Sequence, residues 1–145
     1  MVKYPTIKIL FRYLYLMKVT IKNIKSENYK NNINLYNNFM RFLQKQFPLK
    51  EDIVVNFVGE RVGKMTTGSR RSNSEINVLT KKRLTRDILR TLAHEWVHEY
   101  QDKILKMKRG PNIGGKNEDM ANAEAGSIMK KFEKTYPKYE EKMYE

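Results

Sequence analysis

The sequence contains no cysteine, and that absence limits the chemistry open to the chain. Disulfide scaffolds, thiolate zinc fingers and thiol catalysis are all excluded, and the composition fits a reducing compartment. Histidine is nearly as rare, with 2 residues among 145. Any site that needs imidazole nitrogens must therefore use those two residues.

Long apolar runs are also missing. Lys or Arg interrupts every apolar stretch within a few residues, so nothing resembles a membrane span. Arg12 breaks the apolar part of the N-terminal region and no small-x-small cleavage site follows it, which argues against a signal peptide. Together with the missing cysteine, these features predict a cytoplasmic protein that has no membrane partner.

Acidic residues are scarce in the first third of the chain. The formal net charge is +13, and residues 1–50 carry ten Lys or Arg against one acid, Glu27. Such a surface attracts nucleic acid and other polyanions. A proteome rich in Lys and Asn would produce the same excess without any such partner. Non-specific nucleic-acid binding through this basic N-terminal third therefore stays open.

With 145 residues, of which 40% are apolar, the chain has the size and composition of one folded domain. Hydrophobic periodicity predicts strands at 18–24, 53–58 and 75–79 and helices at 31–47, 85–106 and 118–133. This order predicts a small α+β domain over residues 17–145, with strand 75–79 at the edge of a short sheet. Residues 1–16 are expected to form a loosely packed basic arm, and residues 63–74 a loop or wide hairpin.

The two histidines, His94 and His98, lie in the segment HEWVH of a predicted helix. Four residues are slightly more than one helical turn, so both imidazoles project from one face and can reach a single metal ion. Glu95 is rotated by about 100° from His94 and so faces a water on the ion instead of the ion itself. This arrangement suits hydrolysis, because the ion acidifies the water and the carboxylate takes its proton.

A catalytic zinc ion needs three protein ligands and one open position. Since no further His or Cys exists, the third ligand must be a carboxylate. Glu118 opens the following helix, where small residues at helical spacing would allow a close approach to the histidines. Asn122, one turn later, can hydrogen-bond the far nitrogen of a ligating histidine. The residues therefore predict one Zn²⁺ held by His94, His98 and Glu118.

The segment HEWVHEYQD, followed about twenty residues after His98 by Glu-x-x-Ala-Asn, resembles the gluzincin metallopeptidases. It is particularly similar, over roughly residues 75–129, to the small ImmA/IrrE-type peptidases and their phage-encoded relatives. The resemblance implies a minimal zincin-like fold, in which a short sheet packs on the HExxH helix and on a second helix that supplies the third ligand. It also implies a zinc peptidase acting on polypeptides, with Glu95 as general base. Asp102 matches an Asp found at that place in thermolysin-like members, and the resemblance implies that it supports the metal ligands, as Asn122 is expected to do.

Several roles stay open in the sequence. No histidine remains to stabilise an oxyanion, and Tyr136, Tyr139 and Arg71 are alternatives for that task. Gln101 lies on the metal-facing side of its helix, either touching substrate or as an ordinary polar residue at the edge of a groove. Arg70 and Arg71 are expected in a solvated turn, although contact with nucleic acid is an alternative.

The alternative function is a basic nucleic-acid-associated protein whose zinc site is structural or vestigial. Glu95 argues against it, because a structural site has no use for a base beside its ligands. A peptidase recruited to nucleic acid by its basic N-terminal third would combine the two functions. The sequence predicts the peptidase and leaves its natural substrate undetermined.

Overall fold

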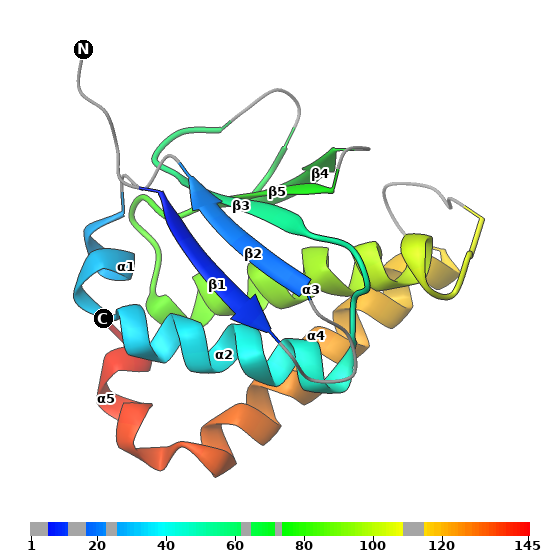
Figure 1. Cartoon of the computed structure of the whole chain (residues 1–145). Coiled ribbons are helices and arrows are strands. Elements are labelled where there is room, and N and C mark those ends of the chain that lie inside the picture. Colours follow the sequence, from blue (N-terminus) through cyan, green and yellow to red (C-terminus); the bar gives the residue numbers. More distant parts are fainter. Residues whose placement is uncertain (1–5, 12–16, 23–25, 62–64, 72–73, 109–114) are drawn as a thin grey trace.

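The computed structural model describes residues 6–11, 17–22, 26–61, 65–71, 74–108 and 115–145 (Figure 1). Its strands are β1 (Ile7–Phe11), β2 (Met17–Lys22), β3 (Ile53–Val58), β4 (Gly68–Arg71) and β5 (Glu75–Leu79). Its helices are α1 (Glu27–Asn31), α2 (Ile33–Gln46), α3 (Thr85–Lys103), α4 (Lys116–Thr135), the 3₁₀ turn η1 (Pro137–Tyr139) and α5 (Glu140–Met143). The predicted mixture of helices and strands in an α+β domain is confirmed.

The five strands form one open sheet in the order β1-β2-β3-β5-β4. β2, β3 and β5 run parallel, and β1 and β4 pair antiparallel at the two edges. The prediction that residues 75–79 form the edge was wrong, because Gly68 pairs opposite Val78 and Arg71 opposite Glu75. The segment GSRR contains no β-branched or aromatic residue, so its composition does not reveal that it is a strand.

The predicted arm over residues 1–16 needs a correction at residues 7–11. These residues form β1, whose backbone pairs with β2 in a register that places Ile9 opposite Val19. Ile9 is 6% exposed and belongs to the hydrophobic core. Strand pairing and the burial of an apolar side chain both hold this segment against the domain. Most of the remaining arm lies outside the described residues.

The core lies between the sheet and the layer of α2, α3 and α4, which cover one of its faces (Figure 1). The apolar stripe predicted on α2 is buried, from Leu35 to Leu43. α2 ends at Gln46, two residues before Pro48, because proline disfavours helical conformation in the residue before it. Trp96 of α3 is fully buried and donates its Nε1–H to the Phe47 carbonyl at 2.9 Å, which ties α3 to the end of α2.

α3 and α4 pack along each other beneath the sheet (Figure 1). Ala121 and Ala125 of α4 are buried, and their small side chains permit a close approach between the two helices. Arg86 Nε of α3 lies 2.8 Å from Glu133 Oε1 of α4 and links the helices at the other end of the contact. In the described part of the chain, no helix combines the length and the apolar character needed to cross a membrane.

The first turn of α3 is held by a residue far away in sequence. The Glu145 carbonyl accepts hydrogen bonds from the Thr85 backbone N–H at 2.8 Å and from Thr85 Oγ1 at 3.1 Å. Asn28 Nδ2 donates to Thr85 Oγ1 at 2.7 Å. The first N–H groups of a helix have no partner within the helix, so the Glu145 carbonyl satisfies one of them.

Candidate metal centre

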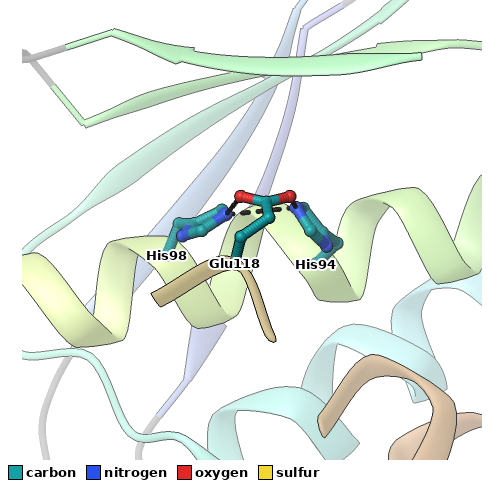
Figure 2. Close-up of side chains that lie close together, drawn as sticks. All are labelled: His94, His98 and Glu118. Carbon is teal, nitrogen blue, oxygen red and sulfur yellow. Dashed lines mark hydrogen bonds and ion pairs between the residues drawn. The ribbon is translucent and has the colours of Figure 1, made fainter. Parts of the chain in front are cut away.

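The segment HEWVH occupies the middle of α3, with its two imidazoles on the same side of the helix (Figure 2). His94 Nε2 and His98 Nε2 are 3.1 Å apart. The opposite side of the segment, Trp96 and Val97, is fully buried in the core. Burial of that side fixes the rotation of the helix, so the histidine pair lies on the side that Glu118 of α4 reaches.

Glu118, the third residue of α4, brings its carboxylate between the two imidazoles (Figure 2). Its Oε1 lies 2.8 Å from His94 Nε2, and its Oε2 lies 3.0 Å from His98 Nε2. The three ligand atoms lie within 4.8 Å of one another. Two atoms bound to the same tetrahedral zinc at about 2.05 Å would lie about 3.3 Å apart. In kind and in spacing, the three predicted ligands are therefore close enough to hold one metal ion.

The surroundings of His94 favour its neutral, ligating form. Burial is the largest effect and lowers the pKa of His94, and the neighbouring His98 lowers it further. The negative charge of Glu118 opposes this shift, and so does hydrogen bonding of the protonated imidazole to the Glu118 and Asn122 side chains. Metal ions bind the neutral imidazole, so a lowered pKa reduces competition from protons at neutral pH.

Each imidazole has a polar partner on another side chain. Asn122 lies near His94 and opposes the lowering of its pKa, and its predicted role as a support of that ring stays a prediction. His98 Nδ1 lies 2.9 Å from Gln101 Oε1, and Gln101 Nε2 donates to the Asn117 carbonyl at 2.9 Å. Because the Gln101 oxygen can only accept, His98 carries its proton on Nδ1 and presents the lone pair of Nε2 to the metal face. The role left open for Gln101 is thus that of a buried support for His98.

Asp102 pairs with Arg70 of β4 and not, as the resemblance implies, with a histidine. Its Oδ2 is 3.7 Å from Arg70 Nη2, and its side chain is 40% exposed. His98 is supported by Gln101, one residue earlier in the chain. Asp102 therefore belongs to an ion pair with β4, outside the support of the histidines.

Glu95 is buried on the side of α3 that faces β4, with 9% of its surface exposed. Burial raises the pKa of Glu95 to about 7. The positive charge of Arg70 opposes the shift, and the negative charge of Glu118 adds to it. A carboxylate that titrates near neutral pH can both take and return a proton, as a general base must.

β4 passes so close to Glu95 that only glycine fits at the crossing point. A Cβ atom added to Gly68 would lie 2.6 Å from Thr91 Cγ2 and 3.0 Å from Glu95 Cγ. Side chains alternate along a strand, so Gly68 and Arg70 face α3, whereas Ser69 faces away. The helix-facing side of β4 therefore lies directly against the predicted base.

The two tyrosines considered for the oxyanion are far from the metal face. Tyr136 follows Glu118 by eighteen residues, which along a helix corresponds to about 27 Å. Tyr139 is buried, and its hydroxyl accepts a hydrogen bond from Asn38 Nδ2 at 2.8 Å. Both tyrosines pack against Phe132 and serve the core. The side chain of Arg71 lies outside the described part of the structure.

Arg70 is the site neighbour that the sequence interpretation missed. Its side chain is 11% exposed instead of solvated, and its Nη1 lies 2.6 Å from Glu99 Oε1. A signal for it exists in the sequence, because Glu95, Glu99 and Asp102 recur at spacings of four and three residues on one face of a helix. Three acids on a partly buried face require a cation opposite them.

Comparisons with known proteins identify no relative. No family model matches the sequence, and no curated protein and no solved structure matches the chain at a significant level. The functional assignment therefore depends on the arrangement of His94, His98, Glu118 and Glu95. These four residues have the chemistry and the placement of a candidate hydrolytic metal centre.

Proposed function

We propose that the chain is a zinc-dependent metallopeptidase with a minimal zincin-like architecture. The observation that carries the proposal is the convergence of His94, His98 and Glu118, at 2.8–3.1 Å, beside the buried carboxylate of Glu95. A structural zinc site uses four protein ligands, whereas a catalytic site uses three and keeps one position open. The described residues provide three in this cluster, which favours a catalytic centre.

Each side chain of the site has a separate role in hydrolysis. Zinc bound by the three ligands would acidify a water molecule and polarise the scissile carbonyl. Gln101 holds the His98 imidazole in the orientation that ligation needs, and Asn122, which lies near His94, would support the other ring. Glu95 takes a proton from the attacking water and passes it to the leaving amine. Its pKa of about 7 suits both transfers near neutral pH.

The edge of the sheet offers a place for an extended polypeptide. β5 pairs with one side of β4, and no other described strand pairs with β4. An edge strand can hydrogen-bond a polypeptide as an additional strand. The sequence analysis placed the edge of the sheet at residues 75–79, but β5 is interior, so the substrate would pair with Gly68–Arg71.

The test compares wild type with Glu95→Gln on a library of unfolded proteins and peptides. Glu95→Gln keeps the size of the side chain but cannot accept a proton, so zinc content should stay at about one per chain while cleavage falls by about a hundredfold or more. A chelator should abolish wild-type cleavage, and zinc should restore it. Equal cleavage by both proteins, unaffected by the chelator, would falsify the mechanism.

A further inference from the structure

Three acids of α3 share the face beneath β4, and one of them is almost completely buried. Glu95, Glu99 and Asp102 follow one another at one-turn intervals, and the Glu99 side chain is 2% exposed. Arg70 reaches down from β4 between two of them. Its Nη1 lies 2.6 Å from Glu99 Oε1, and its Nη2 lies 3.7 Å from Asp102 Oδ2. One guanidinium thus contacts two carboxylates on successive turns.

The strand and the helix run alongside each other with matching spacing. Gly68 lies against Glu95, and Arg70, two residues later, lies against Glu99, four residues later. Two strand residues advance about 6.7 Å. Four helical residues advance about 6 Å. Each helix-facing position of β4 therefore meets one turn of α3.

This contact is what holds β4 in place along the helix. The strand has four residues and takes backbone hydrogen bonds from one neighbour, β5. Gly68 has no side chain that could contact α3. Ser69 faces the other side of the sheet, where Asn77 Nδ2 donates to its Oγ at 3.3 Å. Arg70 is therefore the helix-facing side chain that can fix how far β4 slides along α3.

We propose that Arg70 is a positioning residue that fixes edge strand β4 on α3. The backbone of Gly68–Arg71, which would pair with a polypeptide substrate, is thereby held at one position relative to the metal ligands. This inference rests on the proposed peptidase function. A guanidinium suits the task because its two terminal nitrogens reach different carboxylates, whereas the single ammonium of lysine reaches one point.

The experiment uses Arg70→Met, which keeps the long stem and removes the charge, and Arg70→Lys, which keeps the charge and removes the fork. The matched control is Arg86→Met, which breaks an ion pair of α3 with Glu133 on the side away from β4. Three quantities are measured in full-length protein: zinc content, amide exchange of β4 relative to β2, and KM and kcat on a pool of quenched-fluorescent ten-residue peptides.

Arg70→Met should retain zinc and exchange its β4 amides faster than wild type. Its KM should rise by about tenfold, the value of one or two lost strand hydrogen bonds. Because the Arg70 charge also acts on Glu95, kcat is measured at a pH well above 7, where it should stay within about twofold. Arg70→Lys should be intermediate, and Arg86→Met should match wild type. A purely structural role would lower kcat through the loss of folded protein and leave KM unchanged, and that result would overturn the proposal.

Unchanged exchange in β4 would also overturn the proposal, whatever the kinetics. If zinc-loaded wild type cleaves no peptide, the proposed function fails and the role in substrate binding fails with it, while the exchange result still decides whether Arg70 holds β4. If Arg70→Met does not fold, the double variant Arg70→Met/Glu99→Met replaces the buried pair with apolar side chains, a change that proteins often tolerate. The same rise in KM is expected there, and an unchanged KM would refute the inference.

Discussion

Gly68 of the edge strand β4 lies against Glu95 of α3, the helix that carries both histidines, with no space for a side chain on the glycine. A Cβ at Gly68 would meet Glu95 Oε1 at 3.2 Å and Glu95 Cγ at 3.0 Å. The position of the predicted base is therefore set by a backbone contact as well as by its own helix. A Cβ added at residue 68 must displace β4, the Thr91 methyl group or the Glu95 side chain.

Gly68→Ala should accordingly lower both stability and activity. Crowding of this kind in a packed interior costs about 1–3 kcal/mol. Gly59→Ala is the control, because no atom lies within 4 Å of a Cβ built at Gly59. Chemical denaturation of both variants tests the expectation. Equal stability of the two would show that the atoms around Gly68 can move aside without a measurable cost.

Glu118→Ala should lose zinc, whereas Glu124→Ala should keep it. Glu118 has one carboxylate oxygen at 2.8 Å from His94 and the other at 3.0 Å from His98. Glu124 lies six residues further along α4, about 9 Å along the helix axis. Metal analysis of the two purified variants, with His94→Ala as the zinc-free reference, makes the comparison. Loss of zinc from Glu124→Ala alone would contradict the ligand assignment.

Gln101→Ala should weaken zinc binding without removing a ligand. Gln101 fixes the proton of His98 on Nδ1 and links that ring to the carbonyl of Asn117, next to Glu118. Loss of such a support lowers metal affinity by about 10–100-fold. Competition with a chromogenic chelator measures the change. Gln46→Ala, at an exposed position near the end of α2, is the control and should match wild type.

Metal-free protein should lose stability as the pH rises, because of Glu95. Burial raises the pKa of this carboxyl from 4.5 to about 7, so its contribution is complete below pH 4.5 and is lost as the pH rises through 7. The loss between pH 5 and pH 8 is on the order of 3 kcal/mol. His94, whose pKa is lowered, contributes the opposite slope below pH 6.5 in every variant.

Glu95→Gln removes the Glu95 contribution and leaves that of His94, so the difference between the two proteins isolates the carboxyl. Urea denaturation in the presence of a chelator at pH 5, 6, 7 and 8 measures it. If the free energy of unfolding depends on pH in the same way for wild type and Glu95→Gln, Glu95 titrates at the same pH in the folded and unfolded chains.

Non-specific binding of nucleic acid stays a prediction of the charge distribution. Lys8 and Lys22 are exposed on β1 and β2, while Lys18 lies 4.0 Å from Asp52. Affinity for duplex DNA should fall steeply as salt rises, because each phosphate contact releases counterions. Fluorescence anisotropy at two salt concentrations measures the slope. Lack of binding at low salt would show that the excess charge has no such partner.

The local parts of the candidate metal centre were predictable, and the reason is geometric. His94, Glu95 and His98 lie within five residues of one helix, so helical periodicity alone determines which of them share a face. Glu118 followed from the absence of any other His or Cys and from its place at the start of the next helix. Zinc itself and peptidase activity remain proposals.

The parts that depend on contacts between distant residues were not predictable. β4 exists because its backbone pairs with β5 and because Arg70 meets Glu99 across 29 positions of sequence, neither of which its own four residues reveal. The support of His98 by Gln101 depends likewise on the Asn117 carbonyl, 16 positions further on. Tertiary contacts here override weak local preference.

The hydrogen bonds between Thr85 and Glu145, which join positions 60 residues apart, also bear on the order of events during synthesis. A ribosome releases the chain from its N-terminus, so both histidines emerge while the partner of the first turn of α3 is still unmade. Glu118 follows His98 by 20 residues and is also late. A nascent chain stopped short of residue 145 would lack this anchor of the helix that carries both histidines. The candidate metal centre therefore lies on a helix whose first turn gains this partner only after residue 145 has been made.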